Sequence, residues 1–291
     1  MQGTQDRLVR AMPAVFVLIW STGFIVARYG MPHSPPMKFL ALRYAASVAC
    51  FVVWALATRA VWPRERKQLL HLAVTGILMH AGYLGGVWAA VKAGMGAGLA
   101  ALLVGLQPVL TAIWISSRGG DVKPRQWAGL ALGLAGLLLV VWQKLGYGEV
   151  HPLNVALALV ALLSITAGTL YQKRFVAPCD VRTANLVQLA AAFAVTLPLA
   201  LLETEAVRWH PQMAGALAWS VLALTLGGSS LLYLLIQRGA ATSVTTLMYL
   251  VPPMTALLAW LLFGEPITLL ILAGIALTAI GVSLVVRQPR G

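Results

Sequence analysis

A histidine and a tyrosine lie one helical turn apart in the middle of a long apolar stretch. His80 and Tyr83 fall within residues 69–92, and His80 is the only ionisable side chain predicted so deep in an apolar segment. Such a side chain normally faces a partner or a wet cavity. An imidazole, with an ordinary pKa of about 6.5, can hydrogen-bond a carboxylate or titrate near working pH. His80 is therefore a candidate substrate-binding residue, although a neutral histidine bonded to a neighbouring helix explains it equally well.

Polar and aromatic side chains interrupt several other apolar stretches. Within lipid, a polar stripe faces protein or a wet cavity, and an aromatic ring beside it suits an apolar or aromatic solute. The predicted substrate-binding residues are Trp20, His80, Tyr83, Gln107, Thr169, Ser229, Tyr233 and Tyr249. Helix packing is the competing explanation, because hydroxylated and aromatic side chains also hold membrane helices together.

Prolines occupy matching places in the two halves of the chain. Pro108 follows Gln107 in one apolar stretch, and Pro252 and Pro253 occur together in another. A proline in mid-helix lacks an N–H and frees carbonyls of the preceding turn. Freed carbonyls near the membrane centre can serve a hinge or a substrate site, so these prolines are predicted kink residues. A kink needed only for packing is the alternative.

The eight acidic residues all fall in predicted loops or at helix ends. Without a carboxylate at mid-membrane, a buried proton relay or cation site built on Asp or Glu is not expected. The two cysteines have no metal-ligand spacing, and neither an H-E-x-x-H run nor a phosphate-binding G-x-x-x-x-G-K-[ST] run occurs. No metal, cofactor or catalytic residue is therefore predicted, and the protein is expected to be neither an enzyme nor a self-powered pump.

The composition indicates that a bilayer surrounds these residues. Hydrophobic residues make up 60% of the 291 positions and charged residues only 10%, too few to cover a water-soluble globule. A helix that crosses the hydrocarbon core needs about 20 mainly apolar residues. Ten such helices are predicted, at residues 12–29, 38–58, 69–92, 96–117, 125–143, 152–173, 183–202, 213–237, 242–263 and 267–286. The predicted fold class is an all-α membrane protein.

The basic residues are predicted to sit in the short connections between these helices. They give a formal charge of +13, but their dispersal does not form the single face that a nucleic-acid partner requires. Most lie on the side of the N-terminus, which the positive-inside rule places in the cytoplasm together with the C-terminus. The opposite side receives Arg28, Lys38, Arg43, Lys92, Lys144 and Arg208. We expect a multi-pass protein of a bacterial-type plasma (inner) membrane, with the lipid bilayer and a small-molecule substrate as partners and a monomer as the simplest state.

The two halves of the sequence are related to each other. Residues 101–143 align with residues 246–288 without a gap. The less interchangeable pairs are Pro108 with Pro253, Gly119 with Gly264, Gly129 with Gly274 and Gly136 with Gly281. Two five-helix repeats are therefore predicted, residues 1–145 and residues 146–291. An odd number of crossings inverts the second repeat, an arrangement that recurs in secondary transporters because inverted halves can open a central cavity to either side in turn.

Several short motifs together resemble one known family. They are Trp20-Ser21-Thr22-Gly23, Leu42-Arg43-Tyr44, the proline-bearing helices four and nine, the Gly264-Glu265 hairpin and the glycine-spaced helices five and ten. In this order the chain resembles EamA-type members of the drug/metabolite transporter superfamily over its whole length, and it is most similar to amino acid exporters. The resemblance implies ten helices, cytoplasmic termini and a central cavity lined by helices one to four and six to nine. Two departures are Gly119-Gly120-Asp121 in the first hairpin and Gln107 where some aromatic amino acid exporters carry a tryptophan.

We therefore expect a secondary transporter that exports small organic metabolites, amino acids and in particular aromatic or hydrophobic ones, by alternating access. Simple facilitation and proton exchange through His80 are both compatible with the sequence. One alternative is the export of drugs or other xenobiotics, although a cationic drug would lack a membrane carboxylate as its counter-charge. A weaker alternative is an integral-membrane enzyme on lipid substrates, which should show clustered acids or metal ligands. The exact substrate, the direction of net transport and the oligomeric state do not follow from the sequence.

Overall fold

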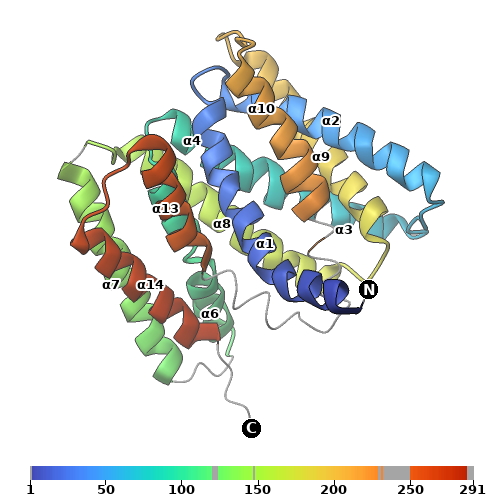
Figure 1. Cartoon of the computed structure of the whole chain (residues 1–291). Coiled ribbons are helices and arrows are strands. Elements are labelled where there is room, and N and C mark those ends of the chain that lie inside the picture. Colours follow the sequence, from blue (N-terminus) through green and yellow to red (C-terminus); the bar gives the residue numbers. More distant parts are fainter. Residues whose placement is uncertain (1, 120–123, 147, 229–230, 232–249, 287–291) are drawn as a thin grey trace. The chain divides into compact units, whose positions relative to one another are not determined.

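The computed structural model describes residues 2–119, 124–146, 148–228, 231 and 250–286 (Figure 1). Within these residues the chain is helical and has no strand. Among them, six helical stretches are long and apolar enough to span a membrane: Pro36–Ala57, Arg66–Lys92, Ala97–Trp114, Pro124–Gly146, Pro152–Phe175 and Val181–Leu202. Shorter apolar helices cover Val15–Gly30, Val251–Phe263 and Leu269–Leu284. The protein is a multi-pass membrane protein, as its composition predicts.

The helix boundaries follow the apolar runs of the sequence closely. The elements are α1 (Gln2–Gly30), α2 (Pro36–Ala57), α3 (Arg66–Gly76), η1 (Ile77–Gly82), α4 (Tyr83–Lys92), α5 (Ala97–Val104), α6 (Gln107–Ser117), α7 (Pro124–Gly146), α8 (Pro152–Phe175), α9 (Val181–Leu202), α10 (Pro211–Trp219), η2 (Ser220–Gly227), α13 (Val251–Phe263) and α14 (Leu269–Val286). Four α-helices begin at a proline, whose missing N–H would have no partner in the first turn. The predicted helices 213–237 and 242–263 run into residues outside the described set. The count of ten helices and the inverted repeat therefore stay predictions.

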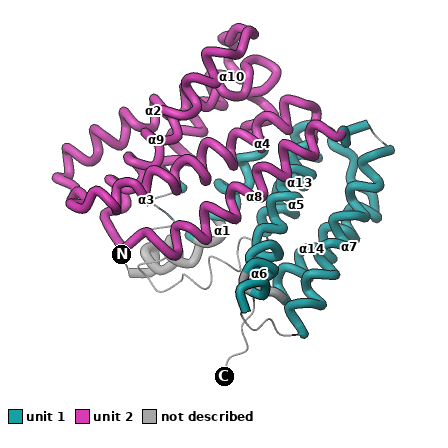
Figure 2. Tube along the Cα trace, turned by 180° about the vertical axis from the view of Figure 1, so that it is seen from behind, with its two compact units in different colours: residues 1–25, 96–151, 227–291 teal, residues 26–95, 152–226 magenta. Residues whose placement is uncertain are grey.

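The chain forms two compact units, and each takes helices from both halves of the sequence (Figure 2). Unit 1 comprises residues 1–25, 96–151 and 227–291, and unit 2 comprises residues 26–95 and 152–226. Unit 1 contains most of α1 with α5, α6, α7, α13 and α14. Unit 2 contains α2, the α3–η1–α4 stretch, α8, α9 and the α10–η2 stretch. The two predicted five-helix repeats, residues 1–145 and residues 146–291, stay a prediction beside this division.

In unit 1, the close packing of α7 against α14 depends on glycine. A side chain at Gly136 would collide with the backbone of Gly274, and one at Gly281 would collide with the backbone of Gly133. Beside them, Thr278 Oγ1 donates to the Gly274 carbonyl oxygen at 2.9 Å. Small residues let helix backbones approach in lipid, where van der Waals contact replaces the hydrophobic effect as the force that joins helices. This helix pair is the scaffold of unit 1.

In unit 2, α2 packs against α9 and α4 packs against α8. The Phe39 ring of α2 stacks on the Trp88 ring of α4, with centroids 4.3 Å apart. At the start of α2, the Glu203 carboxylate accepts the backbone N–H groups of Met37 at 2.9 Å and Lys38 at 2.8 Å. A carboxylate at a helix N-terminus satisfies N–H groups that have no intrahelical partner. These contacts hold α2, whose buried residues include the polar side chains of Arg43, Tyr44 and Ser47.

Candidate functional site

The helix that carries His80 changes to a π-helix around this residue. η1 separates α3 from α4, and a glycine lies at each of its ends. Gly76 approaches the backbone of Gln188 on α9, and Gly82 approaches the side chain of Ser164 on α8. A π-helical turn is rare and is found frequently at functional sites. His80 therefore occupies the most irregular part of its helix, where neighbouring helices come closest.

His80 is held by both α2 and α9. Tyr44 Oη donates to the His80 carbonyl oxygen at 2.9 Å, and the two rings meet edge-on with centroids 6.2 Å apart. The imidazole also hydrogen-bonds with the side chain of Gln188, which is buried. Tyr83 is buried on the next turn of the same stretch. His80 has the helix-to-helix partner that a structural role requires, and it lies in a polar group that a solute could use.

The structure corrects the predicted place of Arg43. This arginine was assigned to a helix end as a topology signal, but it lies in the second turn of α2 and its side chain is only 7% exposed. Arg43 Nη2 donates to Thr225 Oγ1 of η2 at 3.2 Å. Tyr44 and Tyr83 lie within electrostatic reach of the guanidinium, as does His80. His80 is therefore not the only ionisable side chain deep in the protein.

A spacing in the sequence could have revealed Arg43. The buried face of α2 includes Phe39, Arg43, Ser47 and Phe51, which follow one another at intervals of four residues. Residues four apart share one face of a helix. An arginine that continues an apolar stripe between two phenylalanines points into the protein and not into solvent. We call Arg43, Tyr44, His80, Tyr83, Gln188 and Thr225 the Arg43 cluster.

The two π-helices, η1 and η2, fall at aligned positions when the two halves of the sequence are compared. The offset that pairs residues 101–143 with residues 246–288 brings η1 onto residues 222–227, within η2. Thr225 corresponds to His80 under this offset. Adjacent residues of α2 contact the two positions, since Tyr44 bonds to His80 and Arg43 bonds to Thr225. The Arg43 cluster is thus built from equivalent irregular segments of both halves of the sequence.

Unit 2 also contains buried polar atoms that have no hydrogen-bond partner. Among the described residues, these atoms are Arg43 Nε, Ser47 Oγ, Thr196 Oγ1 and Ser220 Oγ. All of them belong to α2, α9 or the first residue of η2. Buried polar groups are nearly always satisfied, so each exception points to a ligand, an ordered water or a functional need. Their gathering in one unit marks that unit as the polar one.

The other predicted site residues divide between the two units. In unit 2, Thr169 Oγ1 donates to the Ile165 carbonyl oxygen of its own helix at 2.8 Å. In unit 1, the Trp20 ring lies 5.3 Å from the Phe16 ring, centroid to centroid, and Gln107 is the first residue of α6. Three predicted residues, Ser229, Tyr233 and Tyr249, lie outside the described residues.

The predicted mid-helix prolines are at helix starts instead. The predicted helix 96–117 is interrupted between α5 and α6, and Pro108 falls in the first turn of α6. Pro252 and Pro253 fall in the first turn of α13. A proline in the first turn removes no intrahelical hydrogen bond. These prolines therefore begin new helices and do not kink an existing one. In unit 1, Gly105 at the α5–α6 break contacts the Pro252 ring, because a Cβ there would lie 3.0 Å from Pro252 Cγ.

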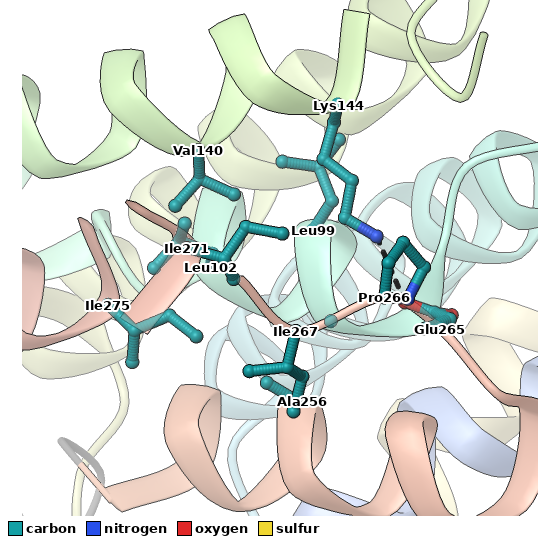
Figure 3. A pocket seen from close by; sticks show the side chains of 11 residues that line it. Leu99, Leu102, Val140, Lys144, Ala256, Glu265, Pro266, Ile267, Ile271 and Ile275 are labelled. Carbon is teal, nitrogen blue, oxygen red and sulfur yellow. Dashed lines mark ion pairs between the residues drawn. The ribbon is translucent and has the colours of Figure 1, made fainter. Parts of the chain in front are cut away.

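Unit 1 contains a small apolar pocket with an ion pair at its rim (Figure 3). Leu99, Leu102, Val140, Ile271 and Ile275 contribute apolar walls. Lys144 Nζ lies 3.5 Å from Glu265 Oε2 at the rim, and it also lies 2.8 Å from Glu149 Oε1. Glu265 Oε1 accepts the Ala97 N–H at 2.9 Å and so caps α5. These charges satisfy one another, and the sequence analysis, which placed them in separate loops, missed the pairing.

No metal centre is evident in the described part of the chain, where no three His, Cys, Asp or Glu side chains come together to hold an ion. The polar groups of the Arg43 cluster are instead donors and acceptors suited to an organic solute. Arginine and tyrosine donate hydrogen bonds, while glutamine both donates and accepts. The cluster thus offers donors and acceptors of the kind that a polar head group requires.

Comparison with known proteins agrees with this membrane architecture. The chain is 27% identical over 267 residues to the uncharacterized inner membrane transporter YedA of Escherichia coli, covering 90% of this chain and 86% of YedA. It is 26% identical to the uncharacterized transporter YvbV of Bacillus subtilis, covering 94% of this chain and 89% of that one. A probable amino-acid metabolite efflux pump of Salmonella typhimurium is 28% identical, over 54% of this chain and 51% of its own.

A solved crystal structure has the same fold, with a TM-score of 0.65 at 20% identity and coverage of 94% of both chains. The profile of the EamA-like transporter family matches the sequence twice, at residues 12–142 and at residues 153–287. These two matches cover most of the chain, one in each half. The chain belongs to the EamA-like transporter family and so to the drug/metabolite transporter superfamily.

Proposed function

We propose that the protein exports amino acids, in particular aromatic or hydrophobic ones, from the cytoplasm by alternating access through a central cavity. The observation that carries the proposal is the Arg43 cluster, in which buried polar side chains and the half-buried His80 come together among apolar spanning helices. Ligand pockets combine mainly apolar walls with a few placed polar groups. An apolar amino acid matches this combination, because its head group is polar and its side chain is not.

The relatives support the same class of solute. The proteins of Salmonella typhimurium and Escherichia coli that match about half of this chain are named probable amino-acid metabolite efflux pumps. The helices that carry the Arg43 cluster also carry buried aromatic residues: Phe39 precedes Arg43 by one turn on α2, and Trp88 follows Tyr83 on α4. Export of cationic drugs is the less favoured function, because the buried charge of Arg43 would repel a cation. Cytoplasmic termini and a monomeric transporter complete the proposal.

The decisive experiment is a flux assay. Purified protein is reconstituted in liposomes, and counterflow is measured for each of the twenty amino acids with and without an imposed pH gradient. We expect flux of aromatic or large aliphatic amino acids, and acceleration by the gradient would indicate proton exchange over simple facilitation. Absence of flux for all twenty amino acids, in protein that is folded and correctly inserted, would refute the proposal.

A matched pair of histidine variants links the flux to the site. His80→Ala should impair transport, because it removes the imidazole that meets α9 in the Arg43 cluster. His71→Ala is the control, since His71 lies on the same helical stretch but its Nδ1 contacts Tyr171 Oη at 2.8 Å instead. Wild-type kinetics in His80→Ala would remove this residue from the transport site.

A further inference from the structure

The guanidinium of Arg43 is a buried charge that has no acidic partner among the described residues. The ion pairs in this part of the chain involve other cations, and none includes Arg43. Its side chain is 7% exposed, and its hydrogen bond to Thr225 reaches a neutral hydroxyl. Burying an ion without a counter-charge lowers the stability of the fold, because the ion loses its hydration and gains no ion pair in return. A residue that carries this cost needs a reason outside the folding of the chain.

The free edge of the guanidinium has a definite shape. Nη2 is oriented by Thr225 Oγ1 at 3.2 Å, whereas Nε has no partner. The Nε–Nη edge of an arginine presents two parallel N–H groups, which match the two oxygens of a carboxylate. Lysine cannot offer this fork, because its ammonium is a point charge. The unpartnered Nε, with the second N–H of Nη2 beside it, is therefore suited to a carboxylate more than to any neutral group.

Unpartnered hydroxyls accompany this edge. Ser47 lies one turn after Arg43 on the same face of α2, and its Oγ is buried without a partner. Ser220 begins η2, the segment that also carries Thr225, and its Oγ is likewise unpartnered. Hydroxyls can donate to carboxylate oxygens that a guanidinium leaves unsatisfied. The unpartnered hydroxyls thus belong to α2 and η2, the elements that carry Arg43 and Thr225, and no described acidic residue pairs with Arg43.

We infer that Arg43 is a solute-binding residue that takes the carboxylate of the transported molecule, and that Thr225 holds its guanidinium in position. This inference rests on the proposed function, because it assumes a solute that passes through unit 2. It deepens that function by naming the recognised group. Solutes should carry one carboxylate beside an apolar body, and derivatives without the carboxylate should be rejected. Thr225 is a positioning residue in this arrangement.

The test compares acids with a derivative that lacks the carboxylate. The full-length protein is placed in lipid nanodiscs, and thermal stabilisation is measured with L-phenylalanine, L-phenylalaninamide and 3-phenylpropanoate. Counterflow of labelled L-phenylalanine in liposomes is competed with the same compounds. Wild type should bind both acids about 10- to 100-fold more tightly than the amide, the range for a hydrogen bond to a charged group. Arg43→Gln should lose this preference by weakening only the acids.

Two further variants keep the result decisive. Arg182→Gln is the matched control, because this arginine pairs with Asp180 at the start of α9 and should leave the preference for acids unchanged. Arg43→Lys keeps the charge but removes the fork, so it should retain part of the preference and serves if Arg43→Gln does not fold. An Arg43→Gln protein, or an Arg43→Lys protein if the first is unfolded, that keeps the full preference would overturn the inference.

The outcomes separate this inference from the proposed function. If amino acids are transported but the amide binds wild type as tightly as the acid, the carboxylate site is wrong and the amino acid transporter stands. If no amino acid is transported but 3-phenylpropanoate stabilises wild type and not Arg43→Gln, the carboxylate site stands and the amino acid assignment fails. If neither flux nor carboxylate binding is found, both are wrong.

Discussion

Lys144 in unit 1 and Arg43 in unit 2 are the buried cations of the described residues, and their surroundings differ. Lys144 Nζ lies 2.8 Å from Glu149 and 3.5 Å from Glu265. Arg43 donates to a neutral hydroxyl, and its Nε has no partner. A buried charge with its counter-charges can be a structural element, whereas one without them lowers stability. The difference separates a cation that joins helix ends from one that our proposal assigns to a solute.

The two units also differ in the regularity of their helices. In unit 1, α7 and α14 meet through Gly136, Gly274 and Gly281, which leave no room for a Cβ, while the α5–α6 break interrupts another helical stretch. In unit 2, the helical hydrogen-bond pattern is interrupted by η1 and η2. Irregular turns of this kind accompany functional sites more often than scaffolds. Unit 1 thus holds the paired buried cation, and unit 2 holds the unpaired one together with the π-helical turns η1 and η2.

The largest expected effect is on the paired cation. Lys144→Met would leave the carboxylates of Glu149 and Glu265 close together without their shared cation. Both crowd Gly96, since a Cβ built on this glycine would lie 2.5 Å from Glu149 Oε2 and 2.8 Å from Glu265 Oε2. Removing one partner of a buried ion pair costs about 3–5 kcal/mol in the free energy of unfolding. Unfolding of the purified protein in detergent micelles measures this loss. Lys92→Met is the control, because its pair with Glu205 is exposed and should contribute about 1 kcal/mol or less. Equal losses in both variants would contradict the structural role of Lys144.

Replacing the unpaired cation Arg43 should change the free energy of unfolding in the opposite direction. Arg43→Met removes a buried charge that has no acidic partner, so the free energy of unfolding should rise by about 1–3 kcal/mol, as when other buried ions are replaced by apolar residues. The same micelle assay measures this gain. Binding of carboxylate solutes should be lost in the same protein, because stability and function compete at such a site. A loss of stability as large as that of Lys144→Met would show that the charge of Arg43 supports the fold.

The helices could be predicted from the sequence, whereas the charges could not. Apolar runs of about 20 residues must be helical in a bilayer, because every backbone N–H and C=O needs an internal partner there. This requirement does not depend on which residues touch. The burial of Arg43 depends on where α2 begins and which face it turns inward, and one turn of difference moves a side chain from the interface into the interior. His80 could be found because no neighbouring charge made it look like part of a loop.

Pairings between distant residues were beyond the reach of the sequence. Lys144 and Glu265 are more than one hundred positions apart, and only the packing of α7 against α14 brings them together. The break between α5 and α6 is also set by packing, since Gly105 contacts the Pro252 ring. The internal alignment pairs Pro108 with Pro253, but it could not tell a kink from a helix start. Local chemistry limits the choices, and tertiary contacts decide among them.

An effect of the same size as that of Arg43→Met, but of opposite sign, tests the scaffold of unit 1. Gly281→Ala places a methyl group against the backbone of Gly133, and this overpacking should lower the free energy of unfolding by about 1–3 kcal/mol. Gly215→Ala is the matched control, because nothing lies within 4 Å of a Cβ at this exposed position of α10. Alanine is the better helix former, so this variant should gain up to about 1 kcal/mol. Thermal unfolding that ranks the two variants in the reverse order would show that α7 and α14 do not pack as closely as described.

The smallest expected effect concerns a third ionic group, outside the membrane-spanning helices. The Arg182 side chain, by hydrogen bonding to the Asp180 carboxylate, lowers the pKa of Asp180 below its ordinary value. The backbone N–H groups of Arg182 and Val61 act in the same direction. A depressed pKa in the folded state means that the carboxylate stabilises the protein above the unfolded pKa of about 3.9, and that this stabilisation is lost as the pH falls through the lower, folded value. Wild type should therefore exceed Asp180→Asn in stability at neutral pH, by about 1 kcal/mol or less.

This pH dependence distinguishes the exposed pair from Lys144 and Arg43. Melting temperatures of wild type and Asp180→Asn, measured in detergent from about pH 7 downward, should converge only as the pH falls through the folded-state pKa of Asp180, which lies below its ordinary value. Arg182→Gln should remove most of the same slope, since the hydrogen bond from Arg182 is the main cause of the lowered pKa. A difference that stays constant over the whole range would mean that Asp180 acts as a neutral cap of α9 and not as a charge. The exposed pair would then hold its helix by hydrogen bonding alone, and strong ionic effects in this protein would be confined to buried cations.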